Sequence, residues 1–474
     1  MALKVTVKII MEDLGVDQEE IELKGECGEE TWEEDSYQLG CAVAREIASE
    51  VLKSIDEQIL QERPKNLKVH DSFKRTRVTR FGMIPVWRRL YQDKDGSYHY
   101  LLDERLNWQP YKWSTPSLRE ALVEMSTQTS FERASKTMEK LTAGVLSDTT
   151  IHRMLQEVSE SAIEGEKQEW ECCFKEGKLP KPGERKTPVV YTEADGLHVH
   201  LQREGKQKHY ELKSAIAYEG WERLPQEDER YGLVSKKVYC HSDPDIPFWE
   251  GASLVWDKYW DMSYLEMIVL GGDDANWINK GVDELPYCIR QLDGFHLSRS
   301  CRKGWENGGD MYEAIRSGRV RQTLGEMKER EGKTAQKERK HVLKCLERGV
   351  DWRKQIEGTP LSFLVSEEAR GLGAMESNED KLFADRMKKR GISWTIRGAQ
   401  HMGKAIQLVA NGELGNWCGR KPPDFREQED RPSFDLFDSR DGSVASVPAL
   451  TGPHSARPWA QILRNLTTHQ YPVT

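Results

Sequence analysis

The sequence predicts an α/β fold built on a mixed β-sheet. Residues 189–201 alternate between the two faces of a strand, so that Tyr191, Glu193 and Asp195 share one face. A second apolar strand, 267–273, ends in acids. Further strands are expected at 209–218, 236–240 and 288–297, with helical segments at 248–264 and near Trp277. The resulting order, β-β-β-α-β-α-β, is that of an RNase H-like domain.

Length and composition predict a globular protein of several domains. A chain of 474 residues with 37% hydrophobic residues and 15 Trp can bury sizeable cores. The sequence has neither an apolar run long enough to span a membrane nor an N-terminal apolar signal core, so a cytoplasmic location is expected. Nine Cys occur without CxxC pairs. They indicate reduced thiols, and neither a zinc site nor a disulfide framework.

The net charge of −9 is unevenly distributed. Residues 1–50 contain 14 Asp/Glu and 4 Lys/Arg, whereas residues 72–90 contain six basic residues and no acid. Residues 297–356 contain 16 Lys/Arg and 9 Asp/Glu. The acidic total is therefore compatible with local basic surfaces of the kind that contact nucleic acid.

The N-terminal part is predicted to contain two segments. Residues 1–69 form an acidic segment with an amphipathic helix at 40–52, suited to packing or dimerisation. Residues 70–115 form a basic β-hairpin region, with a polar turn at 93–97 and a strand at 98–102. Its basic residues, Arg77 and Arg80 among them, are equally compatible with a phosphate-contacting ribbon and with a solvated face.

Residues 116–175 are predicted to be helical and to include a helix-turn-helix. Helices are expected at 130–141 and 147–158, the second with a Ser or Asp cap. A compact helical hairpin is an equally good interpretation. In the helix-turn-helix interpretation the second helix presents four residues to a major groove, namely Thr149, Thr150, His152 and Arg153. The Pro- and Gly-rich residues 176–186 read as a linker to the next domain.

Residues 187–420 are predicted to form the RNase H-like domain, with a helical insertion at about 298–370. The first and fourth strands of such a sheet are neighbours, which brings Asp195 and Asp273 together. Close carboxylates need a cation, and oxygen ligands favour Mg²⁺ or Mn²⁺ over zinc. A third carboxylate is expected from a later helix, where Glu376 lies in the first turn close to Glu379 and Asp380. Residues 421–474 read as a flexible tail.

Several motifs carry a family resemblance. They are Glu193-Ala194-Asp195-Gly196, Gly272-Asp273-Asp274-Ala275-Asn276-Trp277-Ile278, Leu292-Asp293-Gly294-Phe295-His296-Leu297, and Ala374-Met375-Glu376 followed by Arg386-Met387 and Ser393-Trp394. The set, in this order, resembles the ISLre-type insertion-sequence transposases, which are relatives of the Mutator-type DDE enzymes. The similarity covers roughly residues 70–420. The chain departs from the family's usual pattern with Asp274 in place of Gly and Asn276 in place of Pro.

The resemblance implies a catalytic site. In such a transposase the acids matching Asp195, Asp273 and Glu376 bind two Mg²⁺ (or Mn²⁺) ions, and His296 assists at the scissile phosphate. A capping or packing role is the alternative for His296. The resemblance also implies partners: double-stranded DNA of the element's terminal repeats and of the target, bound by a homo-oligomer at the nucleoid.

The function expected from the sequence is DNA transposition by strand cleavage and strand transfer at a two-metal DDE site. Two alternatives remain open. One is a catalytically inactive or domesticated DNA-binding regulator that retains the fold. The other is an RNase H-like nuclease that cuts DNA without strand transfer.

Overall fold

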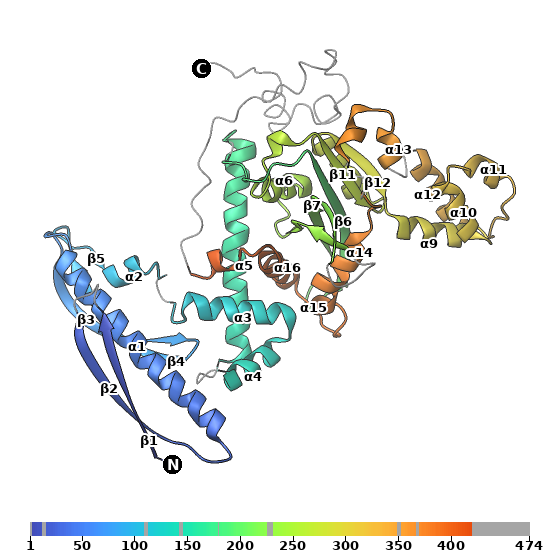
Figure 1. The fold of residues 1–474 in the computed structure, drawn as a ribbon. Coiled ribbons are helices and arrows are strands. Elements are labelled where there is room, and N and C mark those ends of the chain that lie inside the picture. Colours follow the sequence, from blue (N-terminus) through green and yellow to red (C-terminus); the bar gives the residue numbers. More distant parts are fainter. Residues whose placement is uncertain are drawn as a thin grey trace, which may run out of the picture. The chain divides into compact units, whose positions relative to one another are not determined.

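The computed structural model describes residues 2–11, 16–108, 112–141, 146–178, 180–224, 231–347, 352–365 and 369–419. The tail predicted at 421–474 lies outside them. The described residues fall into two compact units, one containing the chain up to Ala162 together with 412–419 and the other containing Ile163–Asn411 (Figure 1). None of the described helices combines the length and the apolar character needed to cross a membrane.

The first unit begins with two antiparallel β-structures and a long helix. Strands β1 (Ala2–Met11) and β2 (Val16–Glu26) pair with each other, and α1 (Trp32–Glu62) extends well beyond the predicted 40–52. Strands β3 (Lys68–Thr79), β4 (Gly82–Gln92) and β5 (Tyr98–His99) form an antiparallel sheet. The prediction of a strand at 98–102 is wrong beyond His99, because Leu101–Arg105 form helix α2, which buries Leu102 in the core with Tyr91.

The helices predicted after residue 116 are present. They are α3 (Pro116–Gln128), α4 (Phe131–Leu141) and α5 (Asp148–Trp170), followed by the π-helical turn η2 (Glu171–Lys175). The predicted serine cap is confirmed, since the Ser147 hydroxyl accepts a hydrogen bond from the Thr150 amide at 3.2 Å. The connection between α4 and α5 lies outside the described residues. Helix α17 (Leu414–Trp417) packs on α3.

The second unit contains the predicted mixed sheet. Its strands are β6 (Val189–His200), β7 (His209–Tyr218), β10 (Lys237–Cys240), β11 (Met267–Gly272) and β12 (Cys288–Leu292), in the spatial order β10-β7-β6-β11-β12. The first three strands in sequence pair antiparallel, and β11 and β12 run parallel to β6. This is the order and direction expected of an RNase H-like sheet. A small hairpin, β8 (Gly220–Arg223) with β9 (Tyr231–Val234), lies outside it.

Two helices pack on this sheet, one against a face and the other along an edge strand. Helix α6 (Phe248–Asp257) packs its aromatic residues, Trp249 and Trp256 among them, against one face. Helix α16 (Ile396–Asn411) lies along the edge strand β10, where Gln407 accepts from the Cys240 amide and Asn411 from the Val238 amide, each at 2.8 Å. Side chains of α16 thus satisfy backbone groups that an edge strand would otherwise leave unpaired.

The predicted fifth strand is too long. Strand β12 ends at Leu292, and Asp293 caps helix α9 (Gly294–Gly304) by accepting from the His296 amide at 2.9 Å. The apolar spacing of 294–297 is compatible with a strand, but Asp293 followed by Gly294 forms the start of a helix. The helical insertion gathers beyond β12 (Figure 1). After α9 it contains α10 (Gly308–Arg316), α11 (Val320–Leu324), α12 (Lys333–Glu347) and α13 (Trp352–Ile356).

The chain then returns to the sheet. The 3₁₀ turn η4 (Pro360–Leu364) is followed by α14 (Ala374–Asn378), the π-helical turn η5 (Glu379–Ala384) and α15 (Asp385–Met387). The other short elements precede β12; they are the 3₁₀ turn η3 (Met262–Tyr264), α7 (Asn276–Asn279) and α8 (Gly281–Glu284). The segment predicted as a linker is tied to the second unit, since the Gly183 amide donates to the Asp257 carbonyl at 2.7 Å. A Cβ at Gly183 would clash with the backbone of Tyr259.

Candidate functional site

Three acids from distant parts of the sequence line one small pocket. Asp195 lies in β6, Asp273 directly follows β11, and Glu376 lies in α14. The register explains the first two positions, because Ala194 pairs with Gly272 in the parallel β6–β11 ladder and each is followed by its aspartate. The structure therefore brings together the three acids that the sequence singled out.

Glu193 determines where α14 begins. Its carboxylate is 3% exposed and accepts hydrogen bonds from the Tyr218 hydroxyl at 2.6 Å and from the amides of Gly373 and Met375 at 2.8 and 3.1 Å. Gly373 has a φ of 150°, in the region that favours glycine. Because Glu376 lies one residue beyond Met375, the Glu193 carboxylate positions the third acid.

Arg290 holds the loop that carries Asp273. The guanidinium is buried and donates to the Leu270 and Gly272 carbonyls, both at 3.0 Å, and it also reaches the Asp273 carbonyl. The Asp273 carboxylate accepts from the Ala275 amide at 2.9 Å. Both contacts fix the backbone at the end of β11, so the Asp273 side chain is held by its own loop and by β12.

Asp293 and His296 form a hydrogen-bonded pair that lines the same pocket. Asp293 Oδ2 contacts His296 Nδ1 at 2.6 Å. This bond raises the pKa of His296 against the effect of burial, and the charges of Asp293, Asp195 and Asp273 raise it further. Burial raises the pKa of Asp293, but the bonds from His296 outweigh it and lower that pKa. The pair favours a protonated imidazole beside the acids.

The electrostatics of the pocket favour a bound cation. Burial raises the pKa of Asp195, and the charges of Asp273 and Asp293 raise it further, while the Gly196 amide and His296 oppose the shift. No Lys or Arg is among the residues that line the pocket in the described part of the chain. Carboxylate oxygens are the ligands that Mg²⁺ and Mn²⁺ prefer, so Asp195, Asp273 and Glu376 fit such ions.

Glu379 is a second acid of this helical segment whose pKa is affected by the charge of Asp195. Burial raises its pKa to about 7, and the charge of Asp195 contributes. Glu379 lies close in sequence to Glu376, the predicted third acid. Glu376, and not Glu379, lines the pocket.

The candidate DNA-contacting arginines of the hairpin differ in exposure. Arg77 is 7% exposed, lies 3.8 Å from Asp103 and stacks over Trp108 at 4.5 Å. Burial lowers its pKa to about 10. Arg77 is thus a buried residue of the first unit, and the expectation that its guanidinium faces a phosphate does not fit this position. Arg80 is exposed and donates to the Ser117 carbonyl at 3.1 Å.

The four candidate residues of α5 lie at its first turns. Thr149 and Arg153 are exposed, whereas Thr150 is half-buried and its hydroxyl pairs with that of Ser147 at 2.9 Å. His152 is half-buried against Phe131, with ring centroids 5.0 Å apart, and burial lowers its pKa. The exposed residues Thr149 and Arg153 remain available to a ligand, while His152 mainly packs.

The role of Glu193 was not among the predictions from the sequence. The signal was present, because an acid in an otherwise apolar strand, two residues before Asp195, must be buried on the same face. Such an acid needs hydrogen-bond donors. What the sequence does not contain is the identity of those donors, which come from residues about 180 positions later.

This protein is an α/β protein with an RNase H-like sheet, and its acidic pocket lies where the carboxyl end of β11 meets Asp195 of β6. Its family follows from comparison with known sequences. Residues 30–419 match the family described as uncharacterised protein family UPF0236, and the chain belongs to that family.

The similar proteins come from bacteria. One UPF0236 protein of Caldanaerobacter subterraneus subsp. tengcongensis is 25% identical over 379 residues, which cover 76% of this chain and 73% of the relative. Another from the same organism is 25% identical and covers 78% and 76%. A UPF0236 protein in the vanSb 3′ region of Streptococcus gallolyticus is 25% identical and covers 70% and 72%.

Replacing Glu193 by Leu tests its positioning role. A leucine side chain accepts no hydrogen bond, so the contacts from Tyr218, Gly373 and Met375 are all lost. We expect a loss of roughly 10- to 100-fold in metal affinity or metal-dependent activity, the usual effect of removing an outer-shell contact. Binding of Mn²⁺ by calorimetry measures it. The control is Thr192→Val, which removes a buried bond to the Ile216 carbonyl that does not reach α14. Equal losses in both variants would contradict the assignment.

Glu379 should make the metal-free protein less stable at high pH. A carboxyl whose pKa is higher in the folded state contributes fully below its unfolded value, and this contribution is lost as the pH rises through about 7. In EDTA we expect Glu379→Gln to melt at a higher temperature than the wild type at pH 8 and at the same temperature at pH 5. The exposed Glu357→Gln serves as control. The same melting difference at both pH values would argue against this account.

Proposed function

We propose that this protein is a DNA transposase that cleaves and joins strands at a two-metal site formed by Asp195, Asp273 and Glu376. The observation that carries the proposal is the convergence of these three acids on one pocket of an RNase H-like sheet. The acids come from two parallel strands and a distant helix, and the only polar companions that line the pocket with them in the described residues are Glu193, Asp293 and His296.

Each residue has a defined task in this proposal. The three carboxylates hold Mg²⁺ or Mn²⁺, which when bound would activate a water or a 3′-hydroxyl and stabilise the leaving oxygen of a phosphodiester. His296, held by Asp293 at 2.6 Å, donates a proton or a hydrogen bond to a phosphate oxygen beside the acids. Glu193 and Arg290 keep Glu376 and Asp273 in place through backbone contacts.

The number of copies of one relative in a single genome supports the proposal that the family belongs to mobile elements. The printed name of one Caldanaerobacter relative, 23% identical over 385 residues, joins eleven locus designations of a single genome. Repeated occurrence of one sequence in a genome is typical of transposable elements. A regulator or a repair nuclease is ordinarily encoded once.

Double-stranded DNA is the partner that this proposal requires. Exposed residues that remain available for it in the first unit include Lys74, Arg75, Arg80 and Arg153. Lys74 also lies over the exposed Trp87, with 5.7 Å between its ammonium and the ring. The basic helical insertion adds further positive charge on the second unit.

An assay with the purified chain tests the proposal. The probe is duplex DNA from the two boundaries of the chromosomal segment that carries the gene, incubated with a target plasmid and Mg²⁺. Joined products are expected, with none in EDTA. Nicks without joining would replace the proposal by a nuclease. A retarded but intact duplex under all metal conditions would replace it by a DNA-binding regulator.

A further inference from the structure

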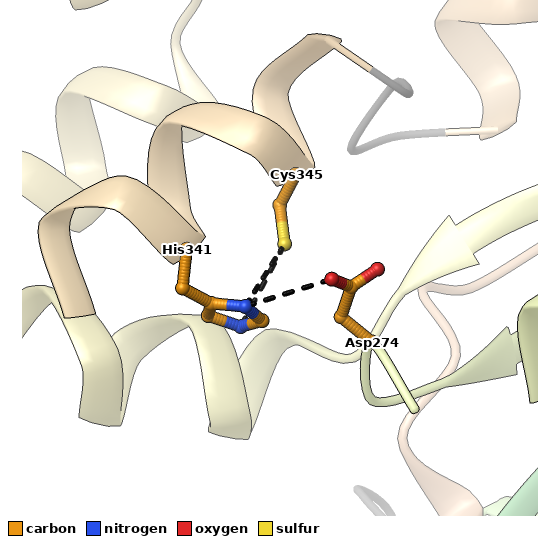
Figure 2. A group of neighbouring side chains, drawn as sticks. All are labelled: Asp274, His341 and Cys345. Atoms are coloured by element: carbon orange, nitrogen blue, oxygen red, sulfur yellow. Dashed lines mark hydrogen bonds and ion pairs between the residues drawn. The ribbon is translucent and has the colours of Figure 1, made fainter. Parts of the chain in front are cut away.

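A second cluster of metal-ligating side chains lies outside the acidic pocket. Asp274 is in the loop after β11, directly next to Asp273, while His341 and Cys345 lie in α12 of the helical insertion. Spacing of four residues places His341 and Cys345 on one side of the helix. Figure 2 shows the Cys345 thiol pointing to the His341 ring, and a nitrogen of that ring facing the Asp274 carboxylate.

The distances suit one small cation. His341 Nδ1 lies 3.6 Å from Asp274 Oδ2 and 3.9 Å from Cys345 Sγ, and one ligand atom of each residue lies within 4.8 Å of the others. Tetrahedral zinc with bonds of about 2.0 to 2.3 Å separates its ligand atoms by about 3.3 to 3.6 Å. Cys345 Sγ lies 3.9 Å from Nδ1 and 3.7 Å from Nε2 of His341, so the imidazole has to rotate and the ligand atoms have to approach by up to about 1 Å to complete such a site.

The surroundings hold the ligands in place. The Asn279 amide donates to Asp274 Oδ1 at 2.8 Å, so the other carboxylate oxygen is the one nearest His341. Cys345 is 2% exposed and belongs to the core of the insertion. The His341 ring is partly exposed, and Lys344 lies at the outer side, with its ammonium 3.8 Å from Asp274 and largely in solvent. A hydrogen bond that orients one ligand, such as that from Asn279 to Asp274, is typical of metal sites in proteins.

We propose that Asp274, His341 and Cys345 bind a zinc ion. A thiolate, an imidazole and a carboxylate together select Zn²⁺ over Mg²⁺, which prefers oxygen ligands alone. A water molecule takes the fourth position, on the exposed side of His341. The expectation of no zinc site from the sequence is contrary to this proposal, because the three ligands lie 67 and 4 residues apart and have no CxxC spacing.

This ion would connect the helical insertion to the loop of the acidic pocket. Asp274 is the neighbour of Asp273, and α12 is otherwise joined to the rest of the insertion through its packing on α9. Zinc would thus fix α12 relative to the end of β11. The inference depends on neither DNA nor strand transfer, so it stands or fails separately from the proposed function.

Zinc content of the full chain is the test. Protein expressed with zinc in the medium and desalted is expected to contain about one zinc per chain by inductively coupled plasma mass spectrometry. Cys345→Ala and Asp274→Asn should lose it at least about tenfold. The matched control is Cys301→Ala, which removes a buried thiol from the same hydrophobic cluster but no ligand, and it should keep the wild-type content.

A second measurement uses only the wild-type protein, so its result does not depend on whether the variants fold. Wild-type protein stripped with a chelator is titrated with Co²⁺, and the expected result is a thiolate-to-cobalt charge-transfer band together with the visible bands of tetrahedral cobalt. Addition of Zn²⁺ should abolish both, and excess Mg²⁺ should not. Absence of zinc in the purified wild type together with absence of the cobalt bands would overturn the proposal. So would equal zinc content in Cys345→Ala and the wild type.

Discussion

Replacing Asp195 or Asp273 by Asn, or Glu376 by Gln, is expected to lower strand cleavage and joining by at least about 10³-fold. Each change removes one carboxylate from the set that would hold the catalytic ions, and the lost charge stabilisation amounts to several kcal/mol of the barrier. The amide side chains keep the shape of the pocket. DNA retention in a mobility-shift assay should stay within about twofold of the wild type, because no candidate DNA-contacting residue is changed.

The matched control for these variants is Glu379→Gln. Glu379 senses the charge of Asp195 but does not line the pocket, so its replacement should leave most of the activity. Activity at the wild-type level in any of the three pocket variants would refute the assignment of that residue. Loss of activity in Glu379→Gln together with full activity in Glu376→Gln would identify Glu379 as the third metal-binding acid.

Replacing Lys404 by Ala should have the largest effect on stability. Lys404 is 0% exposed, and its ammonium donates to Glu166 at 2.6 Å and to Gln407 at 3.0 Å. Gln407 in turn donates to Glu166 at 3.0 Å. Removal of the lysine leaves Glu166 without its charged partner in a site that is largely closed to water, which costs about 3 to 5 kcal/mol. Thermal unfolding should shift downward by roughly 10 °C or more.

An exposed lysine provides the comparison for Lys404. Lys389 pairs with Asp380 at 2.6 Å and Asp385 at 2.8 Å, but its side chain is 48% exposed. Lys389→Ala should therefore cost no more than about 1 kcal/mol. Differential scanning calorimetry of both variants measures the contrast. A loss at Lys404 as small as that at Lys389 would show that the buried pair contributes little.

Local sequence patterns were sufficient to predict the sheet at the centre of the second unit. The alternation of 189–201 and the apolar run before Asp273 gave strands β6 and β11 nearly to their ends, and the order of elements gave the sheet. The expected proximity of Asp195 and Asp273 followed from the same reasoning, since the two residues occupy matching positions of neighbouring parallel strands. These features depend on spacing within a strand and on strand order.

Features set by contacts between distant residues were not predictable. Arg77 was expected at a surface because it belongs to a basic run, yet Asp103 and Trp108 bury it. The end of β12 is different, because the Asp293 cap that stops the strand is a local signal that the sequence contains. The Glu193 contacts to α14 and the approach of α12 to Asp274 depend on how the insertion folds back, and no periodicity encodes that path.

The amide side chains of Gln407 and Asn411 have a consequence for assembly. By bonding to the backbone of β10 they occupy the hydrogen-bonding positions through which an open sheet could recruit a strand from a neighbouring molecule. Two copies of this chain therefore cannot join by extending the sheet across β10. Extension of this sheet by a second copy would have to use its other edge strand, β12.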